Sequence, residues 1–258
     1  MEAIFGVWLP SIGYYNAKNF VGTPYVPGEY ANNLIDLANA NPERQIYLWI
    51  DFAHLRPKEM AFMVELNKKT PRNLIFKNLR AIEKYNNEEL LHKPETEIWK
   101  KVNYSRLIAA EHLLKNPRIE AAFYGDLDIK AKNYSSPGIQ KRMKTNGCIF
   151  CWTRFGHSAP LFENSFFGFD KKHINILTEF FIPETETAMK SHANRREWGA
   201  FRNCIRSLFY KSGFDPEKKA QKFGIRRQTI WGRGNKECKV SFQKNCPIKG
   251  MSPPAPGR

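Results

Sequence analysis

The chain alternates short apolar runs with longer stretches in which apolar residues recur at helical spacing. Continuous apolar runs of strand length are typical of inner strands that are covered on both faces of a sheet. Recurrence every three or four residues indicates helices with one buried side. We expect strands at residues 3–9, 46–50, 73–76, within 119–128 and at 147–152, and helices at residues 29–39, 57–67 and 96–114.

This alternation favours an α/β fold, with a mixed, mostly parallel central sheet flanked by helices. After about residue 170 the apolar spacing becomes helical, so we expect a helical C-terminal part. Beyond residue 232 the periodicity is lost, and the Pro-rich end is predicted to be disordered. The simplest division is one domain at residues 1–232 and a C-terminal tail at residues 233–258.

Two aspartates, Asp126 and Asp128, follow an apolar run of strand character. In an extended chain, residues i and i+2 point to the same side, so both carboxylates would project together from the end of the strand. Such a pair suits Mg²⁺ or Mn²⁺, which keep part of their coordination sphere for water and substrate phosphates. The alternative interpretation of two acids after a strand is a solvated turn.

Three residues lie where predicted strands end, namely Trp8, Asp51 and Asp126. Because ligands of α/β sheets bind at the carboxyl ends of the strands, these positions are expected to share one cleft. Arg106 lies beside the apolar stripe of the helix at 96–114, from which a long side chain can reach into such a cleft. The alternative for Trp8 is a tryptophan of the hydrophobic core.

Composition adds a strong positive charge, because 41 basic side chains against 25 acidic ones give +16. This field attracts anions, and nucleotide diphosphates, nucleic acid and acidic surfaces all satisfy it. The 42% hydrophobic content excludes general disorder. Five cysteines make no disulfide framework, and Cys148 with Cys151 gives only half of a zinc site, so buried thiols are favoured. No apolar run approaches the roughly 18 residues of a membrane span, and no secretory signal is recognised.

Several short segments follow one another along the chain: Ile4 to Leu9, Asn41 to Asp51, Arg106, Asp126 with Asp128, Glu163 with Asn164, and Thr229 to Trp231. Their order resembles that of the GT-A glycosyltransferases with an Asp-x-Asp motif found among bacterial toxins and effectors, including the clostridial glucosylating toxins. The resemblance covers about residues 3 to 232. Two departures stand out: Asn103 replaces the Asp of an Asp-x-x-Arg pattern, and a longer Lys115–Arg118 turn precedes the Asp-x-Asp strand. The matching residues are Ile4 to Leu9 with Trp8, then Asn41, Pro42, Leu48, Trp49 and Asp51, then Arg106, Asp126, Asp128, Glu163, Asn164, and Thr229 to Trp231.

The resemblance implies a metal-dependent hexosyltransferase that uses a UDP-sugar carrying glucose or N-acetylglucosamine, with retaining stereochemistry. It implies that Asp126 and Asp128 bind Mn²⁺ or Mg²⁺, and that Glu163, Asn164 and Asp128 form the catalytic set. Glu163 could instead be a capping or surface acid. The residues implied to bind the UDP-sugar are Trp8, Asp51, Arg106, Asp126, Thr229 and Trp231, the last two on a mobile lid.

The expected acceptor is a protein of a host cell, which would make the chain a secreted effector delivered without a signal peptide. A glycan or lipid-linked acceptor of surface polysaccharide synthesis, inside the producing cell's cytoplasm, is the other option. The alternative function is a basic nucleic-acid-binding domain whose paired acids are incidental, and we disfavour it. We expect a monomer.

Overall fold

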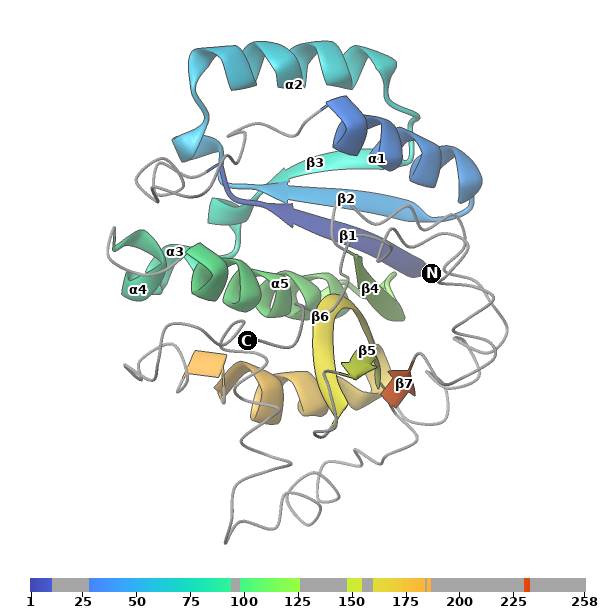
Figure 1. Cartoon of the computed structure of the whole chain (residues 1–258), viewed down its shortest axis with the longest axis vertical. Helices are drawn as coiled ribbons and strands as arrows, with labels where there is room; N and C mark the ends of the chain where they lie inside the picture. The colour runs from blue at the N-terminus through green and yellow to red at the C-terminus, as the bar shows by residue number, and fades with distance from the viewer. Residues whose placement is uncertain are drawn as a thin grey trace, which may run out of the picture.

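In a computed structural model, the chain forms a seven-stranded sheet with the strand order β3-β2-β1-β4-β6-β5-β7 (Figure 1). The structure describes residues 1–10, 28–93, 98–125, 148–154, 160–183, 185–186 and 230–232. The strands are β1 Glu2–Trp8, β2 Gln45–Ile50, β3 Leu74–Asn78, β4 Ala121–Gly125, β5 Cys148–Arg154, β6 Pro160–Asp170 and β7 Ile230–Gly232.

Strand pairing confirms the predicted mixed, mostly parallel sheet. Strands β1, β2, β3 and β4 pair in parallel, and β7 runs parallel to β5. Only β6 runs against its neighbours among the described strands, since it pairs antiparallel with both β4 and β5. The central strands β1 and β2 are buried along nearly their whole length, which agrees with their continuous apolar sequences.

Helices cover both faces of the sheet, as predicted. On one face lie α1 (Gly28–Ala40) and α2 (Pro57–Lys69), and on the other lie α3 (Glu83–Asn87), α4 (Glu89–His92) and α5 (Ile98–Lys115) (Figure 1). Two hydrophobic clusters fill these layers, one containing Leu34 and Leu66, the other Leu107 and Ile108. None of the helices in the described part of the chain is long and apolar enough to cross a membrane.

Helix α5 is buried on two sides, which explains its apolar character around most of its circumference. One side packs on the strands β1 and β4, and another contacts the short helical segment Ile176–Phe181. Leu107, Ile108 and Ala109 are therefore all 0% exposed. This burial fixes the helix that carries Arg106 against the sheet.

Two C-terminal elements differ from the sequence-based expectation. The stretch 161–168 was not predicted as a strand, yet it forms the long strand β6. Ile230–Gly232 was expected in a mobile lid, but its backbone pairs with β5 as the edge strand β7. The predicted helix after residue 170 is confirmed only for the short segment around Ile176–Phe181, because residues 187–229 lie outside the described part.

Candidate functional site at the carboxyl edge of the sheet

The predicted strand exits occur at the carboxyl edge of the sheet. Trp8 is the last residue of β1, Asp51 directly follows β2, and Asp126 directly follows Gly125, the last residue of β4. Trp8 pairs with Ile50 in the sheet register, so the exits of β1 and β2 lie side by side. Asp126, Asp128 and Thr229 lie outside the described residues, and Gly125 marks the point where the sheet ends before the aspartates.

Trp8 and Arg106 belong to opposite faces of the sheet. Trp8 is 9% exposed and lies in the cluster that contains α1 and α2 residues such as Leu34 and Met63. Arg106 is half-buried on α5, on the face where Tyr124 belongs to the other cluster. A ligand that contacts both residues must therefore extend around the carboxyl edge of the sheet.

Arg106 is held close to the end of β4 by two contacts. Its guanidinium carbon lies 4.6 Å from the centroid of the Tyr124 ring, which is a cation–π contact. Its Nη1 atom donates to Asn103 Oδ1 at 3.3 Å. Asn103, which stands at the acidic position of the Asp-x-x-Arg pattern, thus supplies an uncharged acceptor to Arg106. This cation is therefore held beside Tyr124, one residue before the end of β4.

Strand β6 brings the Glu163–Asn164 pair toward the same edge. Gly125 pairs with Phe166 on β6. On its other side, β6 pairs Phe167 with Phe150 and Glu163 with Cys151. Asn164, Ser165 and Phe166 therefore have no partners on β5, and β6 contains a bulge at this point. Bulges of this kind are common beside active sites, where they redirect side chains.

The same register brings Glu163 and Trp231 to one level of the sheet. Cys151 of β5 pairs with Glu163 on one side and with Trp231 on the other. For Glu163, Asn164 and Trp231 the structure describes the backbone. The sequence placed Glu163 and Trp231 in one site only through a family resemblance. Their shared pairing with Cys151 supplies a physical reason for the proximity of their backbones.

Asp51 is 0% exposed, and its carboxylate accepts hydrogen bonds from several donors. Oδ1 accepts from Arg80 Nε at 2.8 Å and from the Ala53 backbone N–H at 3.2 Å. Oδ2 accepts from the Tyr85 hydroxyl at 2.8 Å and lies 3.4 Å from His54 Nε2. Burial alone would raise the pKa of Asp51, but the hydrogen bonds from Arg80 and Tyr85 outweigh it and lower the pKa. The carboxylate is therefore ionised, and its visible role is to hold its neighbours in place.

Sequence reasoning missed Arg80, Tyr85 and His54 as members of this edge. Arg80 follows Asn78, the last residue of β3, whose side chain accepts from the Arg80 backbone N–H at 3.1 Å. This repeats the arrangement at the end of β2, where Asp51 accepts from Ala53. The predicted third strand ended at residue 76, two residues early, which hid Asn78 as a strand exit.

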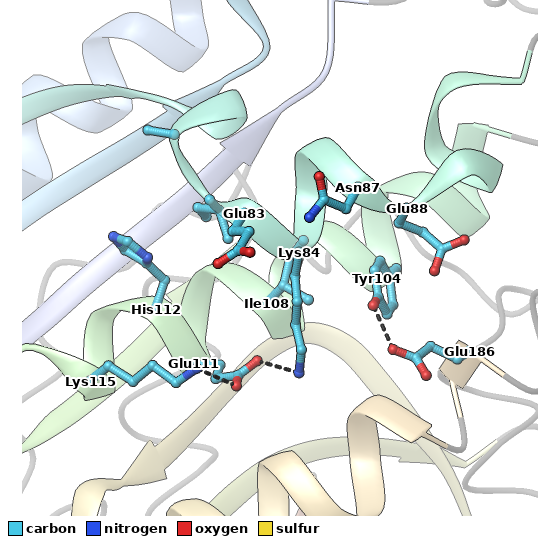
Figure 2. Close-up of a pocket in the computed structure, with 12 residues that line it drawn as sticks. Glu83, Lys84, Asn87, Glu88, Tyr104, Ile108, Glu111, His112, Lys115 and Glu186 are labelled. Carbon is cyan, nitrogen blue, oxygen red and sulfur yellow. Dashed lines mark hydrogen bonds and ion pairs between the residues drawn. The ribbon is translucent and has the colours of Figure 1, made fainter.

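A groove of about 680 Å³ lies between α3 and α5 (Figure 2). Lys84 and Lys115 both bind Glu111, each at 2.9 Å, and the Tyr104 hydroxyl donates to Glu186 at 2.6 Å (Figure 2). Burial and the bond to Glu186 raise the pKa of Tyr104, so its hydroxyl stays protonated. None of the predicted site residues lines this groove. Its lining residues are Ala81, Ile82, Glu83, Lys84, Asn87, Glu88, Tyr104, Ile108, Glu111, His112, Lys115 and Glu186.

Within the described ranges, no three His, Cys, Asp or Glu side chains are grouped so that they could hold a metal ion. Any metal site built from Asp126 and Asp128 thus depends on residues beyond Gly125. Two adjacent hard carboxylates at a strand exit are chemically suited to Mg²⁺ or Mn²⁺.

No protein-family model matches the chain, and no curated protein is detectably similar in sequence. Among solved structures, PaToxG glycosyltransferase has a TM-score of 0.48 at 17% identity, covering 88% of this chain and 76% of that one. Galactosyltransferase LgtC, in complex with donor and acceptor sugar analogs, has a TM-score of 0.45 at 11% identity, covering 80% and 70%. A 4-diphosphocytidyl-2C-methyl-D-erythritol synthase from Anaerococcus prevotii reaches 0.41 at 12%, covering 90% and 86%. Similarities of this size carry no inference about the reaction.

Proposed function

We propose that the chain is a metal-dependent glycosyltransferase that moves glucose or N-acetylglucosamine from a UDP-sugar to an acceptor. One observation supports this most directly. Gly125, the residue before the Asp-x-Asp pair, is hydrogen-bonded to β6 only a few residues from Glu163 and Asn164. The strand that leads into the Asp-x-Asp segment therefore pairs with the strand that carries Glu163 and Asn164, 35 or more positions later in the sequence.

The residues around this meeting point supply the groups that sugar transfer requires. The leaving nucleoside diphosphate carries about two negative charges, and Arg106 is a cation held by Tyr124 near the end of β4. Asp126 and Asp128 would hold the divalent cation, which when bound acts as a Lewis acid toward the diphosphate. The Glu163 carboxylate would stabilise the positive charge that develops at the reacting carbon of the sugar, and Asn164 would hydrogen-bond to the sugar.

The nucleoside end of the donor is assigned to Trp8 and to the C-terminal segment. The Trp8 indole, at the exit of β1, provides an apolar edge for the uracil ring. Thr229 and Trp231 would cover the donor and exclude water, and the pairing of β7 with β5 supports a fixed place for the Trp231 backbone. Retention of configuration is part of the proposal by resemblance alone.

For the acceptor, we favour a protein side chain in a host cell, reached by secretion without a signal peptide. A glycan or lipid-linked acceptor inside the producing cell is the second option. The net charge of +16 suits an acidic acceptor surface in either case.

The test is release of UDP from UDP-glucose and UDP-N-acetylglucosamine, with Mn²⁺, Mg²⁺ or a chelator. We expect slow, metal-dependent hydrolysis with at least one donor. The double variant Asp126→Asn, Asp128→Asn should lower the rate on the order of 100-fold or more, while Asp36→Asn, which removes an exposed carboxylate on α1, should keep the wild-type rate.

Absence of UDP release with every donor and metal would count against the enzyme. Nucleic-acid binding is measured in parallel, because the alternative function predicts metal-independent binding that weakens steeply with salt. Isotope-labelled donors incubated with cell lysates, followed by mass spectrometry, would then identify the acceptor class.

A further inference from the structure

Arg80 lies at the carboxyl edge, and its side chain is 33% exposed. Its contacts with Asp51 fix the orientation of the guanidinium group. Its Nε donates to Asp51 Oδ1 at 2.8 Å, and its Nη2 lies 3.4 Å from Asp51 Oδ2. Nη1 makes no hydrogen bond with the residues that the structure describes. One side of the guanidinium is therefore engaged by a buried carboxylate and the other is available.

His54 belongs to the same arrangement and is 38% exposed. Its Nε2 lies 3.4 Å from Asp51 Oδ2 and 3.5 Å from Arg80 Nη2. The Tyr85 hydroxyl closes the set by donating to Asp51 Oδ2 at 2.8 Å. Two partly exposed nitrogen-bearing side chains, from the short 3-10 helices after β2 and β3, are thus oriented by one buried anion.

A buried carboxylate is a costly way to join two loops unless its charge has another use. Here it removes much of the rotational freedom of an arginine before any ligand arrives, which lowers the entropic cost of binding. The fork of a guanidinium matches the oxygens of a phosphoryl or carboxylate group.

We propose that Arg80 and His54 form a preorganised binding site for an oxyanion, with Asp51 and Tyr85 as positioning residues. This site is separate from the proposed metal site. Arg80 follows β3 and His54 follows β2, which lie three and two positions from β4, about 14 Å and about 10 Å at the usual strand spacing of about 4.8 Å. One diphosphate held at the end of β4 does not span that distance, and UDP carries no other anionic group. The second site therefore takes an anionic group of the acceptor.

The experiment is titration of the metal-free full chain with inorganic phosphate, followed by calorimetry and by the NMR signals of the Arg80 Nε–H and the His54 ring. Saturable shifts of both signals are expected. Arg80→Gln should weaken phosphate binding about tenfold or more, since it removes a charge-assisted contact. Tyr85→Phe leaves Arg80 intact and should weaken binding by a smaller factor, and Arg80→Lys should restore part of the affinity.

Arg72→Gln is the matched control, because Arg72 is an exposed arginine close to the opposite end of β3. An equal loss of phosphate affinity in the Arg72 and Arg80 variants, or no shift of the Arg80 signal, would overturn the site. Adding UDP tests the source of the anion: simultaneous binding of UDP and phosphate assigns the site to the acceptor, and competition at Arg80 would overturn a site separate from the diphosphate. The readout is binding, so it remains decisive even if no sugar transfer is detected.

Discussion

Arg106 lies over the ring of Tyr124, with its guanidinium carbon 4.6 Å from the ring centroid. Tyr124 in turn stacks on Phe167 of β6, with the ring centroids 4.9 Å apart. The cation is therefore supported by a stack that joins α5, β4 and β6. The stack thus joins the buried Phe167 of the core to Arg106 near the end of β4.

Replacing Arg106 tests its assignment to the diphosphate. Arg106→Gln should weaken UDP binding by about ten- to one hundredfold, because a charge-assisted contact to phosphate is lost. The UDP affinity of Arg106→Lys should fall between those of Arg106→Gln and the wild type, since lysine keeps the charge without the planar fork of the guanidinium. Calorimetric titration with UDP and Mn²⁺ measures both. Arg118→Gln, an exposed arginine before the other end of β4, should bind UDP as the wild type does, and a matching loss there would reduce the effect to general electrostatics.

The aromatic stack should also control stability. Phe167 is 0% exposed, so Phe167→Ala should lower the free energy of unfolding by about 3–5 kcal/mol. Phe167→Leu should cost less because it leaves a smaller cavity. Urea unfolding followed by tryptophan fluorescence measures the change. Val64→Ala on α2, where the side chain is 54% exposed, should stay within about 0.5 kcal/mol, and an equally mild Phe167→Ala would contradict the packing described here.

Asp51 should make the stability of the fold sensitive to acid. Its pKa is lowered in the folded state, so its ionised form stabilises the fold fully above the unfolded value of about 3.9. That contribution is lost as the pH falls through the lower folded pKa. Asp51→Asn should therefore cost about 3 kcal/mol near neutral pH, and its difference from the wild type should stay constant from pH 6 to about pH 5 and shrink as the pH falls below about 4.

Melting temperatures of both proteins across that pH range test this. Glu65→Gln provides the control, since Glu65 pairs with Lys68 on an exposed face and should change stability little at any pH. A difference between Asp51→Asn and the wild type that stays constant down to pH 3 would exclude the proposed linkage.

Asn73 offers a contrast, because it should matter for stability and not for ligand binding. Its Nδ2 lies 2.9 Å from the carbonyl oxygens of Ala38 and Asn41 and 3.1 Å from that of Arg44. Asn73→Ala should lower the free energy of unfolding by about 1–3 kcal/mol, and Asn73→Asp by more, because a carboxylate would face three carbonyl oxygens. UDP affinity should be unchanged in both at temperatures where they are folded, since this contact lies at the amino end of β3. A selective loss of UDP affinity would refute this separation.

Local periodicity was sufficient to predict the N-terminal elements, and contacts between distant segments explain what it missed. The apolar runs of β1 and β2 and the helical stripe of α5 are visible within single windows of sequence. Strand β6 contains Glu163, Asn164 and Ser165, which interrupt any simple alternation, and its partner β4 lies some 40 positions away. Strand β7 has only three residues and is defined by its pairing with β5.

The candidate site follows the same division. Trp8, Asp51 and Asp126 were predicted at strand exits because the ends of apolar runs are local features. The burial of Asp51 was not predictable, since its partners Arg80 and Tyr85 come 29 and 34 positions later. The bond between Asn103 and Arg106 was within reach of sequence reasoning, because both lie on one helix at i, i+3 spacing.

The bulge in β6 divides the strand into an inner part that pairs with β4 and an outer part that pairs only with β5. On the C-terminal side of the bulge, Phe167 and Phe169 are fully buried in the core and pair with β4, so they cannot shift without disturbing that strand. On its other side, Glu163 is in register with β5 alone. Lengthening or shortening β6 at Asn164 and Ser165 would leave its inner half untouched while moving its outer half, so this edge of the sheet can diverge between descendants of the chain without refolding the interior.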